Sequence, residues 1–179
     1  MKVIKKLIVP ILFIFIFLVL LFVFSGNISD NKTSNISSVV YAVFNCPNGE
    51  LIENVYVSQY GEGVSYETDN EDDDYYLALY QEYFNSANID KFISLGTGIY
   101  YHGLCDNLNA TLSVDNISIS KDPKIEYCYD VIVSLTYLDG TADDETFDIN
   151  CVARLDEKDL LTSFEIESES QSYLDSIFK

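Results

Sequence analysis

The chain has 179 residues, with 29 Asp and Glu against ten Lys and Arg, which gives a formal net charge of −19 at pH 7. Such a charge repels the phosphates of nucleic acids, so we expect no direct contact with DNA or RNA. The length allows one domain with its own hydrophobic core beside a short targeting segment.

An apolar segment of 18 residues, 7–24, lies near the N-terminus. As a helix it nearly spans a hydrocarbon core of about 30 Å, and it is longer than the apolar region of a signal peptide, about 7 to 15 residues. Lys2, Lys5 and Lys6 precede it, so the positive-inside bias places residues 1–6 in the cytoplasm. We therefore predict a single-pass protein of the cell membrane, with a transmembrane anchor at 7–24; the alternative is a cleaved signal peptide.

The part beyond the anchor carries seven Lys and Arg against 29 Asp and Glu, a charge near −22. Residues 25–37 are small and polar, which predicts a flexible stalk. Two segments rich in strand-forming residues then flank a turn-forming Cys-Pro-Asn-Gly cluster at 46–49. This pattern predicts a hairpin-like segment over 38–68.

An acidic run at 69–74 leads into apolar residues at helical spacing, from Tyr76 to Ala87. Carboxylates favour the N-terminus of a helix, and the run lacks the turn glycine of a calcium loop, so we interpret it as a solvated helix cap. A short second helix is expected after Asn88, ended by Gly96 and Gly98.

The rest of the chain to residue 166 is predicted to form antiparallel strands. Leu112 and Val114 alternate in one parity and Ile117 and Ile119 in the other, which predicts a bulge or turn at 115–116. Strict alternation follows over 125–137, 147–155 and 160–166, and residues 169–179 form a C-terminal tail. The expected core consists of Tyr76, Leu79, Tyr80, Phe84, Val131, Val133, Leu135, Ile149 and Phe164.

Four cysteines, Cys46, Cys105, Cys128 and Cys151, are candidate disulfide residues, because all lie in the part predicted to be exported. Three connectivities are open, and buried free thiols are an equal alternative. The strand parity places Cys151 inward and Cys128 outward, so a bridge between these two needs a bulge. Metal-ligand spacing is missing and His102 is the only histidine, so we expect no metal site and no cofactor.

The segments YLALYQEYFNSANIDKFISLGTGI and YDVIVSLTYLDGTADDETFDINCVARLDEKDLLTSFEI, within residues 75–166, resemble the extracytoplasmic domains of the TcpC family of conjugal transfer proteins, which are related to VirB-type scaffolds. The resemblance implies an α+β fold: an N-terminal transmembrane helix followed by a single nuclear transport factor 2 like roll, with helices packed on a curved antiparallel sheet over 69–168. Family members commonly carry two such domains, and segment 38–60 has no counterpart.

The resemblance implies a membrane-anchored scaffold or interaction subunit of a conjugative type IV secretion apparatus. Such a subunit has no catalytic residues and contacts other envelope proteins. A homo-oligomer is one form that these contacts could take. One alternative is an exported binding or immunity module. The other is a cavity enzyme of the same fold, in which His102 with Asp106, or a pocket tyrosine such as Tyr127 or Tyr129, acts as acid or base.

Overall fold

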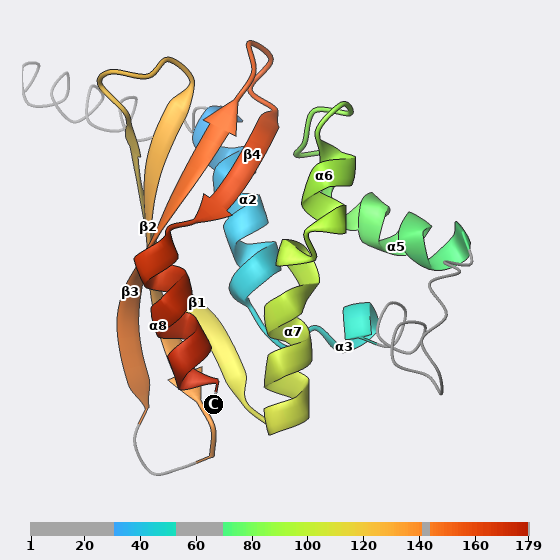
Figure 1. The fold of residues 1–179 in the computed structure, drawn as a ribbon, viewed down its shortest axis with the longest axis vertical. Coiled ribbons are helices and arrows are strands. Elements are labelled where there is room, and N and C mark those ends of the chain that lie inside the picture. Colours follow the sequence, from blue (N-terminus) through green and yellow to red (C-terminus); the bar gives the residue numbers. More distant parts are fainter. Residues whose placement is uncertain (1–30, 53–69, 141–143, 179) are drawn as a thin grey trace, which may run out of the picture. The chain divides into compact units, whose positions relative to one another are not determined.

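Four antiparallel strands form the sheet on which the helices pack. The computed structural model describes residues 31–52, 70–140 and 144–178. The strands are β1 (Thr111–Lys121), β2 (Cys128–Leu138), β3 (Glu145–Leu155) and β4 (Leu161–Ile166). Their spatial order, β1-β2-β3-β4, is the order in the sequence, so the sheet is a meander (Figure 1).

The predicted alternation in the two central strands is confirmed. Val131 pairs with Cys151 and Val133 with Ile149, and all four side chains are buried on one face. The predicted irregularity in β1 is also confirmed, because the register shifts between Val114 and Asn116. This bulge lets the apolar residues on both sides of it face inward.

The last strand differs from the prediction by a bulge. Alternation from residue 160 placed Leu160 and Thr162 with Phe164 on the inner face, but the register with β3 shifts beside Leu155. Leu161 is therefore buried opposite Leu155, whereas Thr162 is half-buried. An extra residue in one strand of an antiparallel pair changes the parity of the residues before it.

Residues 31–44 form a helix, α2 (Asn31–Phe44), where we predicted the end of a stalk and the start of a hairpin. Both predictions are wrong in this stretch, because the fully buried residues of α2 follow helical spacing. These are Ile36, Val39, Val40, Val43 and Phe44. The positions i, i+3, i+4, i+7 and i+8 make one continuous helix face, and this face covers the sheet. The rest of the predicted hairpin, 53–68, lies outside the described residues.

The remaining helices are α3 (Gly49–Leu51), α5 (Asn70–Tyr80), α6 (Ile89–Ser94), α7 (Thr97–Leu108) and α8 (Ser168–Ile177). α5 and α6 correspond to the two expected helices, although α5 ends at Tyr80 and begins inside the acidic run. Gly96, in the left-handed conformation at φ 67°, follows α6 as expected, but a further helix that was not predicted, α7, begins at Thr97. Gly98, however, lies inside α7, and the expected tail is helix α8.

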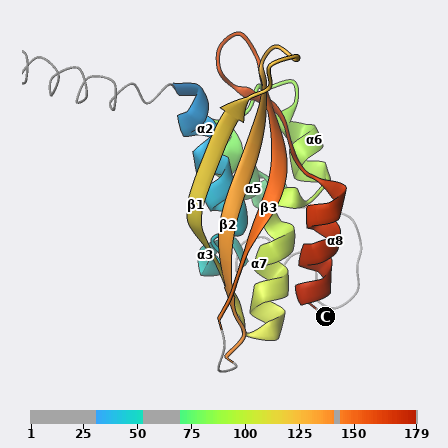
Figure 2. The ribbon, with the colours of Figure 1, turned by 90° about the vertical axis from the view of Figure 1, so that its left-hand side faces the viewer.

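The helices share one side of the sheet, as Figure 2 shows for α2, α6 and α7 behind the strands. α8 completes this side at the β3 end, where Phe178 packs against Tyr101 and Tyr137 with ring centroids 6.0 and 5.2 Å apart. The opposite face turns toward the viewer in Figure 2. The residues that point to this face are mostly short and polar. Ile132 is 44% exposed on this face, between Ser118 of β1 and Asn150 of β3, and Leu138 is 39% exposed at the end of β2.

The chain is thus α+β, with a four-stranded antiparallel sheet and helices. The predicted fold class is wrong in placing a transmembrane helix before a roll, because no helix among the described residues is long and apolar enough to cross a membrane. The predicted anchor at 7–24 lies outside those residues. By their contacts, Lys32–Lys179 form one compact unit.

Of the predicted core, every residue is buried except Leu79, which is half-buried at the edge of the core. Tyr80 and Phe84 make an aromatic cluster with Phe92, with ring centroids 5.0 and 4.5 Å from it. The hydroxyl of Tyr80 donates to the carbonyl of Gly98 at 2.9 Å. A side chain at Gly98 would lie 2.7 Å from the Tyr80 ring, so α7 approaches α5 this closely only through a glycine.

Adjacent positions on β2 provide a matched test of the two sheet faces. We expect Val133→Asp to lower the free energy of unfolding by more than about 3 kcal/mol, because an unpaired carboxylate enters the core. Ile132→Asp, on the open face, is expected to change it by less than about 1 kcal/mol. Urea unfolding followed by circular dichroism measures both, and equal losses in the two variants would contradict this assignment of faces.

Candidate functional site

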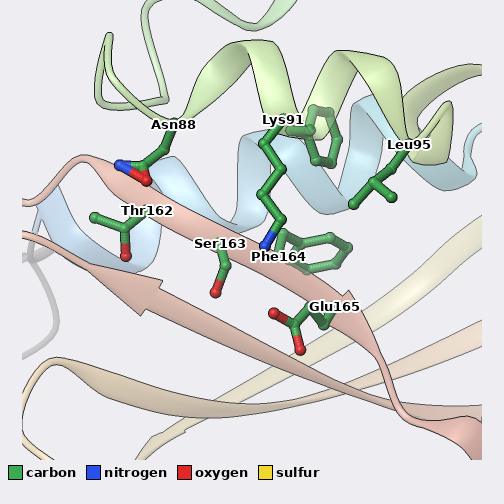
Figure 3. A pocket seen from close by; sticks show the side chains of 8 residues that line it. Asn88, Lys91, Leu95, Thr162, Ser163, Phe164 and Glu165 are labelled. Carbon is green, nitrogen blue, oxygen red and sulfur yellow. The ribbon is translucent and has the colours of Figure 1, made fainter.

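A narrow groove lies between helix α6 and the edge strand β4. Its lining residues are Asn88, Lys91, Phe92 and Leu95 from the α6 side and Thr162, Ser163, Phe164 and Glu165 from β4. Figure 3 shows the α6 side chains pointing toward the strand, with Lys91 reaching across to Phe164. We call this feature the α6–β4 groove.

The elements that form the groove are held together by a short stretch of backbone pairing. Leu161 N–H donates to the Tyr83 carbonyl and the Leu161 carbonyl accepts from Asn85 N–H, both at 2.8 Å. The Asn85 side chain donates to the Asp156 carboxylate at 2.6 Å. This hydrogen bond lowers the pKa of Asp156, which is therefore ionised at neutral pH. The start of α6 is thus fixed against the start of β4.

The floor of the groove is apolar and its rims are polar. Phe92 and Phe164 are both 4% exposed and form the floor, whereas Leu95 is 66% exposed at the rim. Glu165 forms an ion pair with Arg154 at 3.4 Å on the outer side of the sheet. Both side chains of this pair are about half exposed, so it contributes little to stability.

The hollow at the centre of the groove has a volume of about 30 Å³. A cavity for a metabolite usually has about 300 to 1,000 Å³. The groove therefore has room for the end of one side chain or a few waters. It does not have the dimensions of a substrate cavity.

A wider hollow lies between α5 and α6, with a volume of about 320 Å³. Its lining consists of Leu77, Asp90, Ile93 and Ser94. These residues bring together one carboxylate and one hydroxyl. The Ser94 hydroxyl donates to the Lys91 carbonyl at 2.9 Å, so this hollow does not provide the hydrogen-bonded nucleophile and base that covalent catalysis needs.

His102 is buried in α7 and both of its ring nitrogens have backbone partners. Nδ1 accepts from Asn48 N–H at 2.9 Å, and Nε2 lies 2.8 Å from the Ala42 carbonyl, to which it donates. Burial lowers the pKa of His102, so the ring is neutral at physiological pH. The ring joins the end of α2 to the turn at 45–48, which is a structural role.

The structure does not bring the other suggested acid–base residues to the histidine. Asp106 is exposed one turn further along α7, and both His102 nitrogens are already occupied. Tyr129 is buried at the start of β2, opposite Ala153. Tyr127 precedes that strand with φ 58° and accepts from Leu155 N–H through its carbonyl at 2.9 Å. These residues do not form one site.

All four cysteines are free and buried. Cys46 and Cys105 lie in the core next to β1, where their thiols interact. Cys151 is on the inner face of β3, where burial raises its pKa to about 12. Cys128 faces Arg154 and lies outside the main core cluster. No group of three or more His, Cys, Asp or Glu within the described part of the chain could hold a metal ion.

Only part of the α6–β4 groove could be predicted from the sequence. The helix expected after Asn88 is α6, and its Phe92 supplies part of the groove floor. The groove itself depends on how α6 lies against β4, which periodicity does not specify. The pairing of His102 with Ala42 and Asn48 depends on helix α2, which was not predicted.

Comparison of the chain with protein families, with curated proteins and with solved structures gives no match. The resemblance of residues 75–166 to conjugal transfer proteins therefore stays a prediction.

The lowered pKa of His102 predicts a pH dependence of stability. The unfolded chain takes up a proton near pH 6.5, whereas folded His102 resists protonation. Its contribution to stability is complete above pH 6.5 and is lost as pH falls toward the folded pKa, by up to about 1.4 kcal/mol per pH unit. Urea unfolding between pH 5 and 8 measures this slope.

The matched variant is His102→Gln, which removes the titrating group and keeps a polar side chain. Titration of the many carboxylates is common to both proteins, so the difference between the two profiles isolates His102. We expect the profiles to diverge below pH 6.5, the wild type losing stability faster. Parallel profiles over the whole range would show that His102 titrates normally in the folded chain.

Proposed function

We propose that the folded unit is an interaction subunit that works outside the cytoplasm by binding another protein. The observation that carries the proposal is the α6–β4 groove, with its exposed leucine above a buried aromatic floor. Apolar side chains at the centre of a contact and polar side chains at its rim are typical of protein interfaces.

The size of the groove supports a protein ligand. A hollow of about 30 Å³ accepts the tip of one apolar side chain and leaves the rest of a partner on the surface. Such a pocket, filled by one anchor residue, is a common form of binding hot spot. Leu95 would lie against the anchor at the rim, while Lys91 and Glu165 offer one charge of each sign.

The charge of the chain supports a basic partner. Seven Lys and Arg oppose 29 Asp and Glu beyond residue 6, and complementary potentials speed association and select partners. The expected ligand is thus an envelope protein with a basic surface and a protruding apolar side chain. Binding to it should weaken as salt concentration rises.

The resemblance to TcpC-like proteins supports one specific form of this proposal, a scaffold role in a conjugative type IV secretion apparatus. An exported binding or immunity module with one cognate protein is the second candidate. The groove serves both, since each requires a stable protein contact. Identification of the partner separates them.

Crosslinking from the groove tests the interaction. We expect a photo-reactive amino acid in place of Leu95 to capture one specific protein in native cells, and mass spectrometry to identify it. The matched control places the same group at Ile132, which is 44% exposed on the open face of the sheet. Capture from Leu95 alone, lost in the additional variant Phe164→Ala, is the expected result.

Conjugation-channel components among the captured proteins would support the scaffold role, and one unrelated exported protein would support the binding module. Capture of a second copy of the chain would support a homo-oligomer. Equal capture from Leu95 and Ile132, or none from either, would contradict the groove as the contact site.

Location outside the cytoplasm has a separate test. The apolar segment 7–24 and the lysines before it support export of the folded unit. Alkaline phosphatase joined after Lys179 should therefore be active in intact cells. Replacing Lys2, Lys5 and Lys6 by Glu should lower that activity several-fold, because the positive-inside bias is removed. A fusion that is inactive with the natural lysines would contradict export.

A further inference from the structure

Two buried thiols from distant parts of the sequence meet at one point of the core. Cys46 forms an antiparallel bridge with Leu112: its N–H donates to the Leu112 carbonyl at 2.8 Å, and its carbonyl accepts from Leu112 N–H at 2.9 Å. The Cys105 thiol, from α7, interacts with the backbone of the same Leu112 and with the Cys46 thiol. The Cys46 thiol donates to the Val43 carbonyl at 3.2 Å. Cys46 is 4% and Cys105 0% exposed.

The environments of the two sulfur atoms differ in a way that suits disulfide chemistry. Burial raises the pKa of Cys46, so its thiol keeps its proton. The interaction with the Cys46 thiol lowers the pKa of Cys105, so Cys105 gives up its proton more readily than Cys46. A thiolate is the nucleophile of thiol–disulfide exchange, and an adjacent thiol is the resolving group.

We propose that Cys46 and Cys105 form a disulfide bond that joins the turn at 45–48 to helix α7. The proposal rests on the proposed location outside the cytoplasm, where disulfides persist. The oxidant is a small or protein disulfide, such as oxidised glutathione or the disulfide form of a thiol–disulfide oxidoreductase.

The bridge forms in two exchange steps during folding. The Cys105 thiolate attacks the oxidant disulfide, forms a mixed disulfide and releases one thiolate. Cys46 then loses its proton and attacks the Cys105 sulfur, which closes the bridge and releases the second thiolate. Two cysteine thiols are oxidised and one external disulfide is reduced to two thiols.

The other two cysteines do not form a comparable pair. Cys151 lies opposite Val131, three residues along β2 from Cys128, which corresponds to roughly 10 Å along the strand. The Cα atoms of a disulfide lie within about 7 Å, so these two cannot be joined without moving the strands. Cys128 and Cys151 should remain thiols.

The test uses the full chain, reduced and unfolded, then refolded in detergent with reduced and oxidised glutathione. Peptide mass spectrometry after alkylation should find the Cys46–Cys105 crosslink and alkylated Cys128 and Cys151. The oxidised protein should melt about 10 °C above the reduced one, since the bridge closes a loop of about 60 residues. Cys46→Ala/Cys105→Ala should lose this shift, whereas Cys128→Ala/Cys151→Ala should keep it.

Free Cys46 and Cys105 after refolding, or a crosslink to Cys128 or Cys151, would overturn the proposal. Acid-quenched native cells provide the second arm. A bridge in cells supports both the disulfide and the external location. A bridge that forms with glutathione but is reduced in cells would instead overturn the external location.

Discussion

The arrangement of the chain follows from the need to cover one apolar face of a four-stranded sheet. Val131, Val133 and Leu135 of β2, with Ile149 and Cys151 of β3, present a surface of aliphatic and thiol groups on one side only. A sheet with one such face must bury it against another layer. Helices α2, α7 and α8 provide that layer, and the short polar side chains of the opposite face meet the solvent.

The need to cover the sheet also explains why the buried His102 has a structural role. The chain must turn sharply between α2, which lies against the sheet, and α3. Backbone groups in this turn are satisfied from two directions, because His102 bonds to Ala42 and Asn48 and Leu112 bonds to Cys46. The Asn45 side chain in turn accepts from Val114 N–H of β1 at 2.9 Å. A buried histidine whose two ring nitrogens are both hydrogen-bonded cannot exchange protons with a substrate. His102 therefore holds the end of α2 and the following turn in place.

The strands could be predicted from the sequence because a sheet with one buried face requires apolar and polar residues to alternate along each strand. The β1 bulge was visible for the same reason, since the parity of apolar residues changes between Val114 and Ile117.

Helix α2 was missed although Ile36, Val39, Val40 and Val43 have helical spacing. Their β-branched side chains favour strands, and the polar residues before them resemble a linker, so local composition was given more weight than period. Helix α7 was missed because Gly98 and Gly103 lower its helix propensity, and only the packing of Gly98 against Tyr80 explains a glycine there. The α6–β4 groove is a product of tertiary packing and has no local signature.

The pairing of α2 with the C-terminal half of the chain has a consequence for the order in which the protein folds. Asn35 donates to the Asp159 carbonyl across 124 positions, and Lys32 forms an ion pair with Asp159 at 3.5 Å. Each strand, by contrast, pairs with its neighbour in sequence, so the sheet forms through local hairpins. Helix α2, which is synthesised early, therefore cannot pack until the sheet, which is synthesised later, has formed. Until then the five apolar side chains that α2 buries in the folded protein are exposed to solvent. The nascent chain therefore exposes an apolar segment for almost the whole of its synthesis, and such a segment is a typical binding site for a chaperone.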